Sequence, residues 1–127
     1  MNKLLVTLLL TLVSPALVAS DLAGFWKHEE QPGWIEVEFV DGVGTGTVRR
    51  NDKFPERVGT ELLRNIKPGK EDDTWVGEVY AARSNDYRDV TITLSKSEQV
   101  EMNLTVKVGF ISRTLTWVRV DEIPEAE

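Results

Sequence analysis

Residues 34–50 read WIEVEFVDGVGTGTVRR and alternate apolar with polar side chains on both sides of a central Asp41-Gly42 pair. Alternation with a period of two is typical of a β-strand that buries one face, and Asp-Gly favours a two-residue hairpin turn with positive φ at both positions. Such a turn fixes the register of the two strands. The expected pairs on the apolar face are Val40 with Val43, Phe39 with Gly44, Val37 with Gly46, and Ile35 with Val48; those on the polar face are Glu38 with Thr45, Glu36 with Thr47, and Trp34 with Arg49.

Two glycines face large side chains in this register. Gly44 and Gly46 lie opposite Phe39 and Val37. Glycine inside a strand is typical of a sharp bend, as a closing barrel requires, and we expect these two positions to leave space in the interior.

The same alternation recurs along the chain and predicts about eight strands. Residues 90–94 and 100–108 each alternate apolar with polar side chains, and further strands are expected at 24–30, 61–66, 74–81 and 114–120. Short antiparallel strands must hide their edges, and a meander that closes on itself does so most completely. The sequence therefore predicts an all-β, antiparallel up-and-down barrel of about eight strands, with a β-sandwich as the alternative. The expected inward-facing residues are Ile35, Val37, Val48, Ile92, Leu94, Met102, Leu104 and Val106.

Residues 1–20 have the composition of a cleavable secretory signal. Lys3 supplies a positive charge, residues 4–13 are apolar except for threonines, and Pro15 ends the run. A ten-residue helix spans about 15 Å, half of a bilayer core of about 30 Å, so a membrane anchor is disfavoured. We expect cleavage after Ser20, or after Ala19, which leaves one barrel domain at 21–120 and a disordered acidic tail at 121–127. The protein is then periplasmic or secreted and is not an integral membrane protein.

Charge and cysteine content narrow the partners. The chain carries 15 Lys and Arg against 21 Asp and Glu, and removal of residues 1–20 takes away Lys3 and no acid, which leaves a net charge of −7. An acidic chain repels phosphate backbones, so nucleic acid is not an expected partner. The absence of cysteine excludes a disulfide, a lipoprotein anchor and thiol catalysis.

The residues that most catalytic and metal sites need are scarce. His28 is the single histidine, which is too few for a histidine-rich zinc site and which we expect at the surface. Glu36 and Glu38 lie two apart on one strand face, about 6–7 Å from each other, but that face is expected to be solvated. We therefore expect no enzyme, no metal and no cofactor.

Several sequence blocks resemble a known bacterial family. Gly24-Phe25-Trp26 near the start and Trp117-Val118-Arg119 near the end are similar to a pairing in lipocalin-like (calycin) barrels. Together with Arg57-Val58-Gly59, Leu62-Leu63, WVGEVY at 75–80, and residues 108–110 and 113–120, they resemble the family called domain of unknown function 2147. The resemblance implies a secreted lipocalin-like barrel with no established activity, in which Arg119 lies across the Trp26 ring. Many members carry cysteines near positions 44 and 106–109, and this chain has none.

Aromatic and arginine side chains are the candidates for binding. Trp34 opposite Arg49 is either a stacking pair or the start of a binding surface. Residues 109–113 place two apolar side chains in a turn, as a lid, an anchor or a plug of the barrel. Residues 49–57 form a mixed-charge connection that is either an ion-paired loop packed by Phe54 or a surface able to orient an anionic head group. The candidate binding residues are Trp34, Arg49, Arg57, Trp75, Tyr80, Phe110 and Arg113, and those for barrel closure are Gly24, Trp26, Trp117 and Arg119.

Two functions fit these features. The first is a non-enzymatic periplasmic binding module that takes a small apolar or amphipathic ligand at the barrel mouth. The second is a protein-interaction module, such as an envelope assembly factor or an inhibitor of an exported enzyme. A barrel of about eight strands is either filled by side chains or holds one small ligand, so the fold alone allows both.

Overall fold

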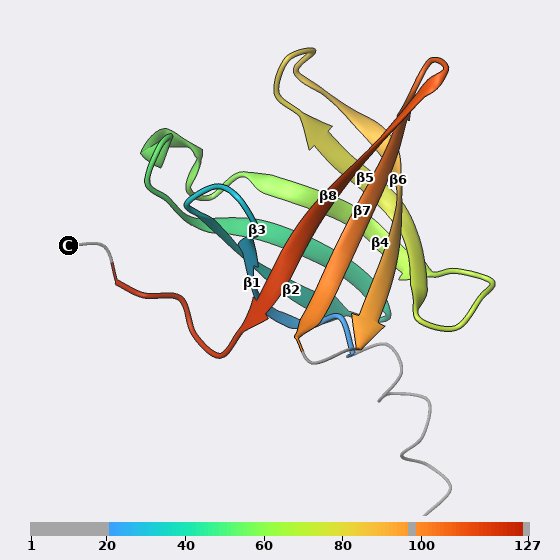
Figure 1. Ribbon diagram of the computed structural model, residues 1–127, viewed down its shortest axis with the longest axis horizontal. Coiled ribbons are helices and arrows are strands. Elements are labelled where there is room, and N and C mark those ends of the chain that lie inside the picture. Colours follow the sequence, from blue (N-terminus) through green and yellow to red (C-terminus); the bar gives the residue numbers. More distant parts are fainter. Residues whose placement is uncertain (1–20, 97–98, 126–127) are drawn as a thin grey trace, which may run out of the picture.

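Eight strands follow one another around a closed antiparallel barrel in the computed structural model (Figure 1), which describes residues 21–96 and 99–125. Each strand pairs with its neighbours in sequence, and β1 pairs with β8. The predicted barrel is confirmed, and the β-sandwich alternative is wrong. The expected export signal lies outside the described residues. The elements are β1 (Gly24–His28), β2 (Gly33–Val40), β3 (Val43–Asn51), the 3₁₀ helix η2 (Pro55–Arg57), β4 (Glu61–Pro68), β5 (Thr74–Ala81), β6 (Asp86–Lys96), β7 (Val100–Val108) and β8 (Ile111–Val120).

The β2–β3 hairpin has the expected turn and almost all of the expected register. Asp41 and Gly42 have φ angles of 53° and 82°, and the six pairs from Val40–Val43 to Ile35–Val48 form as predicted. The seventh pair is wrong. A β-bulge between Trp34 and Ile35 makes Trp34 pair with Arg50 rather than Arg49, because a bulge sets two residues of one strand against one of the other.

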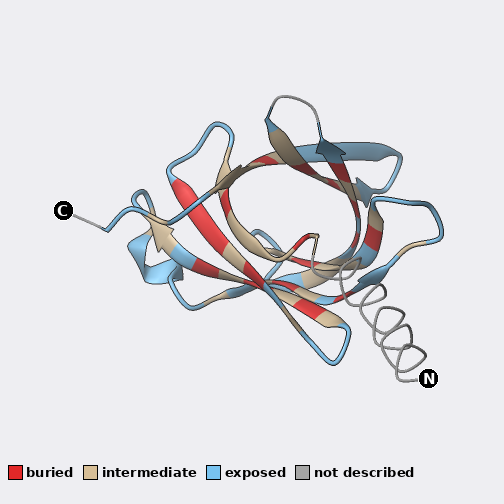
Figure 2. Ribbon diagram, turned by 90° about the horizontal axis from the view of Figure 1, so that it is seen from below, coloured by how far each residue is buried: buried red, intermediate tan, exposed pale blue. Residues whose placement is uncertain are grey.

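Buried residues recur along the strands around the barrel (Figure 2), and the apolar core includes seven of the eight expected inward-facing residues, with Val106 partly buried against it. The space expected at the two glycines is taken. A Cβ atom at Gly44 would lie 2.8 Å from ring carbons of Phe39, and one at Gly46 would lie 3.1 Å from side-chain carbons of Leu63. The glycines thus let large side chains lie directly against the β3 backbone, and the space expected at these two positions is filled.

One end of the barrel is closed by residues 21–23, which β1 and β8 hold in place. The Trp26 indole N–H donates to the Leu22 carbonyl at 3.0 Å, and the Leu22 side chain is fully buried. The Arg119 guanidinium lies 4.4 Å from the Trp26 ring and donates to the carbonyls of Asp21 and Ala23. Gly24 permits this contact, because its φ is +133° and a Cβ there would lie 2.7 Å from Arg119 Nη1. The Arg119–Trp26 contact that the family resemblance implied is present, whereas Trp117, also expected at the closure, lies beside His28.

The opposite end is uneven. The β5–β6 and β7–β8 hairpins extend beyond the other strands there (Figure 1). Strand length explains the difference, since β1 has 5 residues whereas β6 has 11 and β8 has 10. Because the long strands pair with shorter neighbours, the inward-facing residues at their ends lie beyond the buried core.

Replacing Arg119 by lysine tests the closed end. An ammonium group cannot cover the Trp26 ring as a planar guanidinium does, nor reach two carbonyls with a rigid fork. We expect Arg119→Lys to lower the free energy of unfolding by about 1–2 kcal/mol in urea titrations. Arg113→Lys is the matched control, because Arg113 is exposed, and it should leave stability unchanged. Equal stability of the two variants would contradict this role of Arg119.

Candidate functional site

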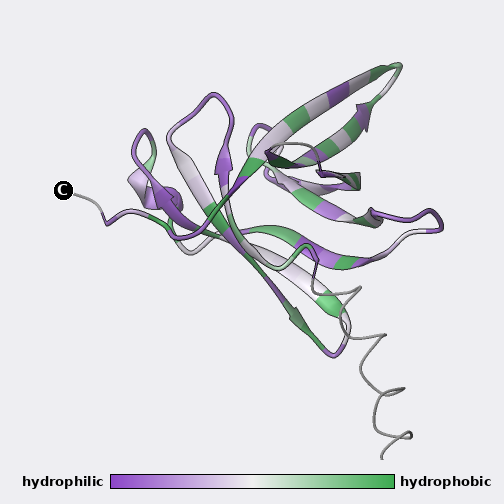
Figure 3. Cartoon of the chain, turned by 60° about the horizontal axis from the view of Figure 1, so that its bottom comes forward, coloured by the Kyte–Doolittle hydropathy of each residue, from purple (hydrophilic) through white to green (hydrophobic). Residues whose placement is uncertain are grey.

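The inner face of the β7–β8 hairpin continues upward from the core as an exposed apolar surface. On β7, Leu104 is fully buried, whereas Val108 is 45% exposed. On β8, Trp117 is buried, whereas Leu115 is 42% and Ile111 is 66% exposed. We call the four residues Val106, Val108, Ile111 and Leu115 the apolar wall; register places Leu115 beside Leu104, and Ile111 beside Val108. Hydropathy colouring shows apolar segments along this projecting hairpin (Figure 3).

An aromatic pair lies below the apolar wall. His28 at the end of β1 pairs with Trp117 of β8, and the ring centroids are 5.0 Å apart at an interplanar angle of 75°. Within the part of the chain that the structure describes, the buried indole N–H of Trp117 has no hydrogen-bond partner. A buried donor without a partner is costly.

The ring of His28 also organises the β1–β2 turn. Its Nδ1 accepts the backbone N–H groups of Glu30 and Gln31, both at 3.1 Å. These two bonds require an unprotonated Nδ1, and burial lowers the pKa of His28, a shift that Glu30 and Glu29 oppose and Lys27 supports. The ring is therefore neutral at pH 7.

Two arginines share the inner face with the apolar wall. Arg113 pairs with Val106, and its side chain makes no ion pair or hydrogen bond within the described residues. Arg88 pairs with Val79 on the facing hairpin and contacts Asp86 at 3.8 Å. The open end thus offers an apolar surface with guanidinium groups beside it.

The expected surface around Trp34 is covered. Trp34 lies on the outer face, as predicted, but it is buried between Lys27 Nζ at 5.5 Å and Arg50 Cζ at 4.7 Å from its ring. Arg50 also donates to the carbonyls of Pro124 and Glu125, so residues 121–125 of the acidic tail run back toward β3. Arg49 instead forms ion pairs with Glu36 at 3.0 Å and Glu38 at 3.3 Å. Trp34 therefore stacks on an arginine, as one of the two alternatives predicted, but the arginine is Arg50 and not Arg49.

Three other candidates lie apart from the apolar wall. Arg57 ends η2 and stacks on Phe54, with Cζ 4.0 Å from the ring. Trp75 belongs to the core, and its indole N–H is unpartnered. Tyr80 lies edge-on to Tyr87, with centroids 5.5 Å apart. Of the expected binding residues, only Phe110 and Arg113 belong to the projecting β7–β8 hairpin, while Trp117 lies beneath it.

Leu115, Arg88 and the role of His28 were not predicted from the sequence. Leu115 alternates with Trp117 inside the expected strand 114–120, so the period of two already placed both on one face. No sequence signal singles out the contact of His28 with Trp117, because it comes from the β1–β8 pairing.

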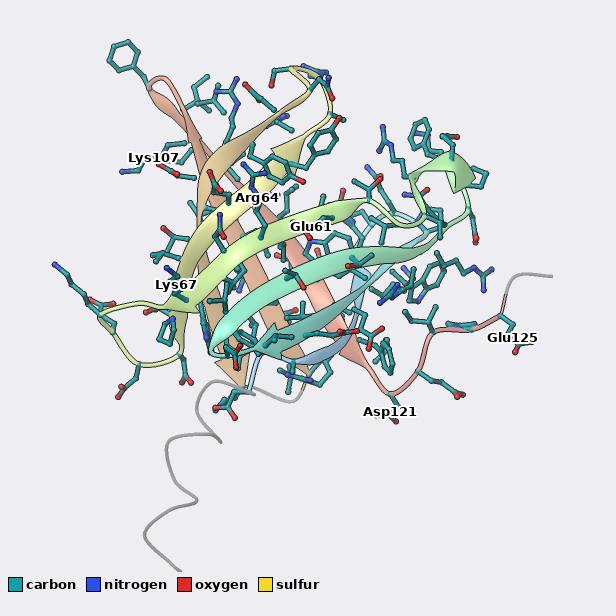
Figure 4. All side chains as sticks on the ribbon, turned by 180° about the vertical axis from the view of Figure 1, so that it is seen from behind. Glu61, Arg64, Lys67, Lys107, Asp121 and Glu125 are labelled. Atoms are coloured by element: carbon teal, nitrogen blue, oxygen red, sulfur yellow. The ribbon has the colours of Figure 1, made fainter. Side chains whose placement is uncertain are left out.

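The surface has two hollows, and the first borders the candidate site because Arg88 is among its lining residues. One, of about 540 Å³, follows β6 and β7. The other, of about 340 Å³, lies between Asp21 and the β4–β5 connection. Figure 4 shows Lys107, which lines the first hollow, on the β7–β8 hairpin.

Among the described residues, no helix has both the length and the apolar character to cross a bilayer.

Comparison with known proteins gives a family and a fold. A family model described as "Uncharacterized protein conserved in bacteria (DUF2147)" matches residues 24–119. No curated protein matches. Among solved structures, the chain is similar to protein HP1028 from the human pathogen Helicobacter pylori, which is described as belonging to the lipocalin family. The two share 14% identity with a TM-score of 0.57 over 80% of this chain and 84% of that one. At that identity the likeness shows the lipocalin fold alone.

Protonation of His28 should destabilise the barrel. Its pKa is lowered in the folded state, so the unfolded chain takes up the proton first as pH falls below about 6.5, and stability falls with it. We expect a loss of less than about 1 kcal/mol between pH 7.5 and 5.5, because the site is partly solvated.

His28→Asn is the control for this effect. Its Oδ1 accepts the same two N–H groups and does not titrate. Urea titrations should therefore show a smaller pH dependence for the variant than for the wild type. An NMR titration that gave His28 a pKa at or above 6.5 would contradict the argument.

Proposed function

The chain belongs to the DUF2147 family of bacterial proteins, and we propose that it is a non-enzymatic periplasmic binding module that holds a small apolar or amphipathic molecule at the open end of its lipocalin-like barrel. The observation that carries the proposal is the apolar wall. Its side chains turn toward the barrel axis, yet Leu115, Val108 and Ile111 are 42–66% exposed. Covering such side chains is favourable at about 25 cal/mol per Å².

The filled interior decides where the ligand binds. The core residues below the wall, such as Ile92, Met102 and Leu104, are fully buried. A ligand therefore lies against the rim rather than deep in the barrel. Few convergent polar groups then suffice to orient it.

Those polar groups favour an anionic or acceptor-bearing head. Arg113 is unpaired within the described residues and shares the inner face with the apolar wall, and Arg88 lies on the facing hairpin. An amphipathic molecule can place its tail on the wall and its head beside a guanidinium, a charge-assisted contact.

Location and lack of catalysis are parts of the same proposal. The signal-like residues 1–20 support export to the periplasm. The single histidine supports a non-catalytic role, because its Nδ1 already accepts two backbone N–H groups and a neutral ring then has no second acceptor. A general base needs a free acceptor.

A thermal-shift experiment with delipidated protein tests the site. Laurate should raise the unfolding temperature, because a ligand that binds only the folded state stabilises it, by about 2.7 kcal/mol at a hundredfold excess over Kd. Leu115→Asp should abolish the shift. Val76→Asp is the matched control, since Val76 is 48% exposed but lies on the outer face of β5.

A neutral analogue of laurate separates the contribution of the ligand's head group from that of its apolar tail. Arg113→Gln should weaken stabilisation by laurate and leave that by dodecanol unchanged. The proposal fails if neither compound stabilises the wild type, or if Leu115→Asp and Val76→Asp behave alike.

A further inference from the structure

The tip of the β7–β8 hairpin carries exposed apolar side chains. Phe110 is fully exposed, and its neighbours Val108 and Ile111 are 45% and 66% exposed. Gly109, with φ +65°, opens the two-residue turn that holds Phe110 at the extreme end. We propose that this tip, residues 107–113, docks the protein onto an anionic lipid surface, a role that does not depend on the ligand site proposed above.

Two cationic residues lie just below the apolar tip of the hairpin. Lys107 pairs with Ser112, and Arg113 pairs with Val106, one and two register steps below the Val108–Ile111 pair. Those steps correspond to about 3 and 7 Å along the hairpin. In this arrangement, when the apolar residues of the tip enter the boundary of the acyl chains, the two basic residues lie at the depth of the lipid head groups.

The positions of the cations favour a lipid surface over a protein partner. Successive side chains on a strand point to opposite faces, so Lys107 lies on the outer face and Arg113 on the inner face. Neither makes an ion pair within the described residues. A flat protein surface meets one face of a two-stranded ribbon, whereas a head-group layer that surrounds the tip meets both.

The charges of the two ends of the barrel also favour docking of the β7–β8 tip onto an anionic surface. The chain has a net charge of −6, yet residues 105–115 contain two cations and no acid. The hairpin tip at the other end of the barrel is acidic, because Glu38 and Asp41 flank the exposed Val40. An anionic surface therefore attracts the β7–β8 tip and repels the opposite end, which orients the molecule.

The backbone limits the depth of docking. β7 pairs with β6 no further up than Val106 with Val90, so the β7 edge above that pair has N–H and C=O groups without a strand partner. Unpaired backbone groups are not tolerated in hydrocarbon. The tip thus enters only the interface, to about the level of its two cations.

Vesicle sedimentation tests the proposal with phosphatidylcholine alone and with about 30 mol% phosphatidylglycerol added. The protein should bind the anionic vesicles and lose binding as salt rises. Lys107→Gln/Arg113→Gln should bind about thirtyfold more weakly, given about tenfold or less for each cation at an anionic surface. Phe110→Ser/Ile111→Ser should bind at least about tenfold more weakly.

Val40→Ser is the matched control, because Val40 is 69% exposed at the opposite hairpin tip, and it should bind like the wild type. Phe110→Trp should keep binding, and its emission should shift to the blue and be quenched by brominated lipids. Unfolding midpoints of all variants should match the wild type, since the substituted side chains are exposed.

Three results would overturn the proposal. They are equal binding to neutral and anionic vesicles, wild-type binding by the Phe110→Ser/Ile111→Ser variant, and capture of an acidic protein by the tip without any vesicle binding. Laurate stabilisation of a Phe110→Ser single variant should persist, because Phe110 is exposed and is not part of the apolar wall, so failure here is distinguishable from failure of the ligand site.

Discussion

Closure of the sheet depends on β1, whose five residues must pair on both sides. Gly24–Lys27 pair with β2, and Phe25–His28 pair with β8. Trp26 lies at the centre of this strand, fully buried, with Arg119 over its ring and Leu22 accepting its N–H. Closing the sheet removes its edges, and here the junction also anchors the chain on either side of the barrel. The closed end therefore combines strand pairing, apolar burial and two carbonyl contacts to one guanidinium.

The shortness of β1 also creates the open end. Paired strands of unequal length cannot finish together, so the longer hairpins project where β1 stops at His28. Side chains on their inner face then have strand neighbours but no partner across the barrel. The apolar wall is the result, because the alternation that buries Leu104 exposes Leu115 one strand away. A single constraint thus accounts for both the closed and the open end.

Much of the fold could be predicted because it is local. Asp41-Gly42 and the alternation around it fixed six cross-strand pairs. The bulge at Trp34 could not be predicted, since Arg49 and Arg50 have the same side chain and either fits the pattern. Nor could the filling of the space at Gly44, which depends on how the Phe39 ring turns. At the open end, turn chemistry pointed to Phe110 and Arg113, but the exposure of Leu115 depends on the length of a strand distant in sequence.

The filled core separates this barrel from one with a deep internal chamber. Met102 and Leu104 are fully buried beneath the apolar wall, and Trp117 with His28 covers the β1–β8 side of the same level. A molecule on the wall would therefore keep one side in water and bury only part of its apolar surface. Because affinity grows with the surface removed from water, such a site favours reversible holding over permanent storage. The neutral ring of His28 supports the bottom of this site, because it contacts the Trp117 indole and also fixes the β1–β2 turn.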